Sequence, residues 1–110
     1  MSPIPIKLRE ELSQDPYYSR CARKFDGNCS GRITWEHAFE YQGRQIQERW
    51  SILPLCWHHH LGEGLDKDKN HWIALHRATV DDFQRHPRKK WYHIMAYLNN
   101  KYINAEEYID

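Results

Sequence analysis

Potential metal ligands constrain this chain more than any other feature of its sequence. Its 110 residues include three cysteines and eight histidines. An odd number of cysteines is poor material for a disulfide framework, and the first residues lack the basic and apolar regions of a signal peptide. The combination of cysteine thiolates with histidine imidazoles is instead typical of metal-binding sites. We therefore expect a small, cytosolic, metal-binding domain.

Four of these side chains have the spacing of ligands for a single structural zinc ion. Cys56 and His59 are three residues apart where a strand is expected to give way to a helix, so one turn can direct both toward a common point. Cys21 and Cys29 flank a turn that contains glycine and can supply the second pair. The alternative is three buried, inert cysteines, because free cysteine is common in protein cores.

The length and composition of the chain limit its possible folds and partners. The chain suits one hydrophobic core, so we treat 1–110 as a single domain, and its 40% hydrophobic residues are typical of a globular protein. No apolar run approaches the ~20 residues that cross a bilayer, which argues against a membrane protein. The formal charge of +1 excludes a large field of one sign, so any DNA-binding face must be a local patch.

The order of apolar and turn residues predicts an α+β fold. A short helix with Leu8 and Leu12 on one face is expected to end at Asp15-Pro16. The pattern then predicts a turn at 25–32, a strand at 33–41, a polar loop at 42–49, a strand at 50–56 that Pro54 restricts to an edge, and a short helix from 57 that Gly62 and Gly64 end.

The remainder of the chain, from about 70 to 110, is expected to be helical. Asn70 is interpreted as the N-cap of the first helix in this part, although Asn70 and His71 could also approach the metal site. Thr79 and Asp82 resemble a capping box, and Pro87 breaks the chain before a further helical stripe. The metal-binding core is accordingly expected at about 21–64.

A second group of polar residues suits metal-assisted hydrolysis of phosphodiesters. A hard divalent cation held by Glu36 and His60 could polarise a scissile phosphate, and His58 is a further candidate ligand. His37 suits a general base, because an imidazole can take a proton from water at neutral pH. Adjacent strand residues face opposite ways, so Glu36 and His37 need a local distortion or complementary roles. The alternative is that these side chains are solvent-facing and without function.

Together these residues resemble the HNH, or ββα-metal (His-Me finger), endonuclease superfamily. The likeness rests on Cys21…Cys29, on Glu36-His37 and on SILPLCWHHH, which runs from Ser51 to His60. It implies a small ββα-metal motif with a structural zinc site, surrounded by helices, and DNA endonuclease activity. It assigns Zn²⁺ to Cys21, Cys29, Cys56 and His59, Mg²⁺ or Mn²⁺ to Glu36 and His60, and the role of general base to His37.

The chain departs from the family pattern at two positions. Ser51 stands where the family has its middle Asn, so the contribution of that Asn to loop geometry is expected from elsewhere, with Gln45 or Gln47 as candidates. Glu36 stands where Asp is more usual, and its longer side chain moves the carboxylate.

Within the superfamily, the stretch from Cys21 to Thr79 is similar to the Ref-like, RecA-dependent recombination nucleases of bacteriophages. This resemblance implies a protein that works in the cytosol of a bacterial host and is directed by a RecA–DNA filament. The basic N-terminal extension of that family is largely missing, since residues 1–20 hold only Lys7, Arg9 and Arg20 as basic residues.

A DNA-cutting enzyme also needs basic side chains that contact phosphates. The candidates are Arg44 and Arg49, in the loop between the strands, and a second cluster that includes Arg88, Lys89 and Lys90. That second cluster is equally consistent with the solvated start of a helix. The five tryptophans could stack on bases, but in a chain of this size they are expected in the core.

Two other functions remain open at this point. A non-catalytic zinc module that binds nucleic acid or protein would keep the Cys and His ligands of zinc and make Glu36, His37 and His60 incidental. A regulatory protein on a decayed nuclease scaffold is consistent with Ser51 and Glu36. Replacement of His37 by Ala separates the enzyme from the module, because only the enzyme loses an activity.

Overall fold

Two antiparallel strands form the centre of the fold. The computed structural model describes residues 3–38, 40–41, 44–79, 81–82, 97 and 99–101. In it β1 (Ile33–His37) pairs with β4 (Ile52–Cys56), and every residue of β4 is buried. Pro54 lies opposite Trp35 and its carbonyl accepts a hydrogen bond from Ala22 N at 2.7 Å. A two-stranded sheet has only edge strands, which is where proline was expected.

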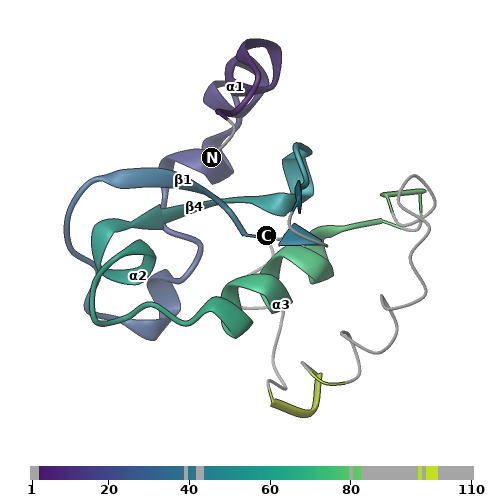
Figure 1. The fold of residues 1–110 in the computed structure, drawn as a ribbon. Helices are drawn as coiled ribbons and strands as arrows, with labels where there is room; N and C mark the ends of the chain where they lie inside the picture. Colours follow the sequence, from purple (N-terminus) through teal and green to yellow (C-terminus); the bar gives the residue numbers. More distant parts are fainter. Residues whose placement is uncertain are drawn as a thin grey trace.

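Helices cover both faces of this strand pair (Figure 1). On one side lie α1 (Ile6–Ser13) and the 3₁₀ turn η1 (Pro16–Ser19), and Leu12 and Tyr18 pack there against Ile52. On the other side lie α2 (Trp57–His60) and α3 (Lys67–Arg77), which bury Leu53, Leu55 and Ile73 in the larger core. The chain is therefore α+β, as expected.

The short first helix forms and ends as its sequence predicts. Leu12 is fully buried and Leu8 packs against the same core cluster, which is the expected apolar face. The helix ends at Ser13, because Pro16 starts a new turn whose N-cap, Asp15, accepts a hydrogen bond from Tyr17 N at 3.0 Å. Among the described residues, no helix combines the length and apolar character needed to cross a lipid bilayer.

A turn between η1 and β1 brings the N-terminal part of the chain against α2. It contains the 3₁₀ turn η2 (Lys24–Asp26) and positive φ angles at Gly27, Asn28 and Gly31. At Gly31, φ is +81° and an added Cβ would lie 2.6 Å from the Cβ of Trp57. Glycine is therefore required at position 31 both for backbone conformation and for the close approach to α2.

The segment between the two long strands is more ordered than its polar sequence suggested. β2 (Glu40–Tyr41) and β3 (Arg44–Gln45) form a second antiparallel ladder, so the expectation of a continuous strand at 33–41 followed by a loop was wrong in detail. The 3₁₀ turn η3 (Arg49–Ser51) follows. Buried Ser51 donates its hydroxyl to the Ile46 and Glu48 carbonyls, at 2.6 and 2.9 Å. Ser51 itself thus supplies loop geometry that was expected from another residue.

The interpretation of Asn70 as a helix cap was wrong. α3 begins four residues earlier than expected, at Lys67, because Asp66 is the N-cap and accepts a hydrogen bond from Lys69 N at 3.1 Å. The capping box at Thr79 and Asp82 is present, with reciprocal bonds of 2.7 and 3.2 Å. The helical stripe expected after Pro87 lies almost wholly outside the described residues.

Candidate functional site

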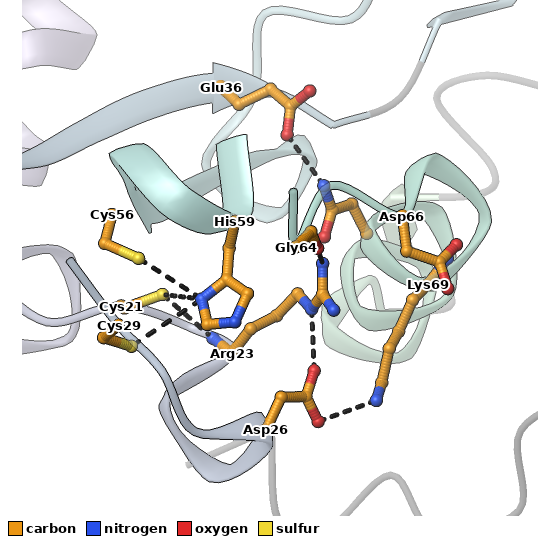
Figure 2. A network of polar contacts seen from close by, with 11 residues as sticks. Cys21, Arg23, Asp26, Cys29, Glu36, Cys56, His59, Gly64, Asp66 and Lys69 are labelled. Carbon is orange, nitrogen blue, oxygen red and sulfur yellow. Dashed lines mark hydrogen bonds and ion pairs between the residues drawn. The ribbon is translucent and has the colours of Figure 1, made fainter. Parts of the chain in front are cut away.

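Three cysteines and one histidine meet at the junction of β4 and α2. The Sγ atoms of Cys21, Cys29 and Cys56 lie 3.4, 3.6 and 3.2 Å from Nδ1 of His59 (Figure 2), and the four donor atoms all lie within 4.8 Å of one another. Tetrahedral zinc with bond lengths near 2.3 Å to sulfur and 2.0–2.1 Å to nitrogen places such donor atoms about 3.6 Å apart. These residues could hold a metal ion such as zinc, and their geometry fits one.

The electrostatics of this Cys₃His cluster also suit a cation. Burial, followed by the charge of Cys21, raises the pKa of Cys29 to about 12. Burial likewise raises the pKa of Cys21. For Cys56 burial acts in the same direction, but backbone N–H groups of His59 and Ser30 lower its pKa overall. Three adjacent thiols cannot all ionise without a positive charge between them, so ligation of a metal ion would release protons.

His59 is held as a neutral ligand. Burial and then the positive charge of Arg23 lower its pKa, so the imidazole keeps a lone pair for a metal ion at neutral pH. Its ring is 1% exposed. Adjacent residues on a helix are about 100° apart around the axis, so His59 and His60 point to different places. His59 faces the three sulfurs, and the ring of His58 packs edge-on against it with centroids 4.8 Å apart.

His60 and Glu36 come to the same face of the strand pair. Thr34 and Glu36 are two residues apart on β1, so their side chains leave the strand on one side. Thr34 Oγ1 lies 2.6 Å from Nδ1 of His60 and donates to the Leu55 carbonyl at 3.0 Å. The hydroxyl has one proton and uses it there, so it accepts the proton on Nδ1 of His60.

This contact fixes the tautomer of His60. With the proton on Nδ1, the lone pair is on Nε2, so Nε2 is the nitrogen of His60 that is available to a metal ion. Burial lowers the pKa of His60, which keeps the ring neutral. Thr34 was not among the residues selected from the sequence. Strand alternation from Glu36 could have pointed to it, but its contact with His60 depends on the packing of α2.

Asn70 is the second residue that adds to this face. The sequence allowed it to approach the metal site, but its interpretation as a helix cap gave it no function there. It is 1% exposed, and its Nδ2 donates to Oε2 of Glu36 at 3.0 Å, the contact drawn on Glu36 in Figure 2. An amide that donates to a carboxylate favours the ionised carboxylate, which is the form that binds a cation. Oδ1 of Asn70 is buried and has no hydrogen-bond partner among the described residues.

His37 occupies a different position from Glu36. Alternation along β1 directs it to the opposite side of the strand, and it is the last residue of β1. Its Nε2 lies 2.8 Å from Oε1 of Gln47, whose Nε2 contacts the Pro3 carbonyl at 3.5 Å. Since the amide oxygen faces His37, Nε2 donates a ring proton to it. Gln47, one of the two residues considered as a substitute for the family Asn, thus orients His37.

The candidate DNA-contacting residues are only partly placed. Arg49 forms an ion pair with Asp15 at 2.6 Å and lies 4.0 Å from Glu11, so acidic residues of the N-terminal part surround it. The side chains of Arg44, Arg88, Lys89 and Lys90 lie outside the described part of the chain. Of the tryptophans, Trp50 and Trp72 are core residues as expected, whereas Trp57 is 51% exposed.

A polar network joins the Cys₃His cluster to the helix that carries Asn70 (Figure 2). Arg23 is 6% exposed, pairs with Asp26 at 2.8 Å and donates to the Gly64 carbonyl at 2.5 Å. Asp26 also binds Lys69 of α3 at 2.7 Å. The turn that holds Cys21 and Cys29 is therefore tied to α3, next to Asn70.

Comparison of the chain with protein-family models, with curated proteins and with solved structures found no match.

Proposed function

We propose that this protein is a divalent-metal-dependent DNA endonuclease of the HNH type. In this proposal β1, β4 and α2 form the ββα-metal motif, and the Cys₃His cluster holds a structural Zn²⁺. The observation that carries the proposal is the common face of Glu36 and His60, where Thr34 leaves Nε2 of His60 free to ligate. Asn70, which holds the Glu36 carboxylate, supports the same assignment.

The proposed chemistry assigns separate tasks to the side chains. A Mg²⁺ or Mn²⁺ ion held by Glu36 and His60 would polarise the scissile phosphate and stabilise the leaving oxygen. His37 would take a proton from the attacking water at Nδ1, because its Nε2–H is committed to Gln47. Gln47 acts through His37 as a positioning residue.

The resemblance to Ref-like nucleases adds a partner to the proposal. A RecA–DNA filament in the cytosol of a bacterial host would direct the cut in phage recombination. The nuclease chemistry does not depend on this partner, so the two parts of the proposal are tested separately.

A zinc-binding module without catalysis is the second candidate. The observation that favours it is the direction of His37, which leaves β1 on the side opposite Glu36. In that case the Cys₃His cluster stabilises a scaffold that binds nucleic acid or protein, and the chain cuts nothing.

A cleavage assay decides between the two candidates. Zinc-loaded protein is incubated with single-stranded and supercoiled DNA and with Mg²⁺ or Mn²⁺, with and without RecA filaments. The nuclease predicts cutting that His37→Ala and His60→Ala each abolish, while His76→Ala serves as the matched control. Cutting only with RecA would establish the partner. Absence of cutting in every condition, from folded and zinc-loaded protein, would favour the module.

A further inference from the structure

A cavity of about 450 Å³ lies along β1, outside the residues selected from the sequence for DNA contact. Within the described residues β1 pairs only with β4, so its other edge is open. The cavity is lined by Arg9, Tyr18, Arg32, Ile33, Thr34 and Trp35. Among the described residues that line the cavity, two are arginines and none is acidic, so this lining has a positive character.

Both arginines are available to a ligand. Arg32 is exposed, and its side chain has no ion pair or hydrogen bond within the part of the chain that the structure describes. The guanidinium of Arg9 lies over the ring of Trp35, 5.5 Å from its centroid. Trp35 is itself fixed, because Nε1 donates to the Tyr18 carbonyl at 3.0 Å. The stacked Arg9 is therefore oriented by the aromatic ring while its N–H groups remain free to donate.

The cavity adjoins the proposed cation site through one residue. Thr34 lines the cavity, and the same side chain contacts Nδ1 of His60 at 2.6 Å. By strand alternation Ile33 and Trp35 face the side of β1 that carries α1 and His37, so a ligand in the cavity lies on that side and meets Thr34 at the open edge of β1. An elongated ligand can occupy the cavity with one end and pass around this edge, at Thr34, toward the face that carries Glu36 and His60.

We propose that this cavity binds a phosphodiester group of the DNA strand that enters the Glu36–His60 site. Guanidinium groups match phosphate oxygens with paired hydrogen bonds, and neither Arg9 nor Arg32 has a carboxylate competing for it among the described residues. The identity of the ligand rests on the proposed function, whereas its charge and shape rest on the cavity.

The test measures DNA binding apart from cutting. Fluorescence anisotropy of a labelled single-stranded oligonucleotide is followed across salt concentrations with zinc-loaded protein and no added Mg²⁺ or Mn²⁺. The variants are Arg9→Gln, Arg32→Gln and the double substitution. Lys67→Gln is the matched control, because it removes one positive charge at an exposed position on α3, away from the cavity. Zinc content and thermal midpoint confirm that each variant is folded.

Each arginine that contacts a phosphate contributes about 0.7 to the slope of log affinity against log salt for a single strand. We expect that slope to fall by about 0.7 in each single variant and by about 1.4 in the double variant, with Lys67→Gln unchanged. A duplex of the same sequence shows which form of DNA the cavity prefers, and weakening with either form supports the proposal. A double variant that binds both forms like the control would overturn it. Because no cutting is measured, the result is independent of the His60→Ala outcome.

Discussion

At the scale of single residues, the proposed cation site depends on two side chains, Thr34 and Asn70, that hydrogen-bond to its proposed ligands His60 and Glu36. The hydroxyl of Thr34 sets the tautomer of His60, and its removal should weaken binding of a divalent ion. For Thr34→Val we predict a loss of Mn²⁺ affinity of about 10- to 100-fold, the usual cost of removing a hydrogen-bond partner of a metal-binding histidine. Electron paramagnetic resonance of free Mn²⁺ measures it. Ser19→Ala removes an exposed hydroxyl and should leave the affinity unchanged.

Asn70 should show opposite effects on stability and on metal binding. Its buried Oδ1, which has no hydrogen-bond partner in the part of the chain that the structure describes, costs about 1–3 kcal/mol of folding free energy. Asn70→Leu removes that cost along with the bond to Glu36, so we predict an equal or higher free energy of unfolding together with weaker Mn²⁺ binding. Urea denaturation and Mn²⁺ titration of the same variant test both parts. A variant that unfolds more easily and binds Mn²⁺ normally would make Asn70 a purely structural residue.

The sequence was informative about residues whose partners are close along the chain. Cys56 and His59 converge because three residues separate them across one helical turn, and Thr79 and Asp82 cap each other over the same interval. Thr34 was missed, and Asn70 was interpreted as a cap and not as a partner of Glu36, because their contacts join segments 26 and 34 residues apart. Such contacts depend on how α2 and α3 pack on the strands, which local patterns do not specify.

At the scale of elements, the turn that holds Cys21 and Cys29 forms one unit with α3. The links through Arg23, Asp26 and Lys69 connect the cysteine turn to the helix that carries Asn70. Because Asp26 and Lys69 are both less than one-fifth exposed, this ion pair is better shielded than a surface one. Loss of zinc should therefore loosen α3 as well as the turn.

The pKa values of the cysteines predict how zinc binding depends on pH. Cys21 and Cys29 have raised pKa values in the metal-free cluster, so both stay protonated near neutral pH. Each must release its proton to bind zinc, so log zinc affinity should rise by at least about two per pH unit between pH 6 and 8. Competition with a chromophoric chelator measures this slope. A slope near zero would contradict a site built from these thiols.

The elements themselves were predicted best where apolar periodicity and turn residues agreed. α1, β1, β4 and α2 fall where Leu12, Pro16, Pro54 and Gly62 indicated. The ladder of β2 and β3 was missed because two-residue strands have too few side chains to show alternation. The start of α3 was misplaced because Asp66 and Asn70 are both good cap residues, and burial of Asn70 against Glu36 decided between them.

At the scale of the whole molecule, one compact unit carries both candidate metal sites. β4 and α2 supply Cys56, His59 and His60 within five residues, and the helix directs the last two to different sites. The α+β class and the joining of Cys21 and Cys29 to Cys56 and His59 were predictable. The sequence did not predict which face of the strand pair each helix covers. The basic cavity between α1 and β1 depends on that arrangement.

The most direct test of the account is anomalous X-ray diffraction from a crystal of the zinc-loaded protein soaked in Mn²⁺. Data at the zinc and manganese absorption edges locate each ion independently. We predict a zinc ion bound by Cys21, Cys29, Cys56 and His59. We predict a manganese ion bound by Glu36 and by Nε2 of His60. A filled zinc site with no manganese at Glu36 and His60 would contradict the two-metal nuclease and leave a zinc-binding module.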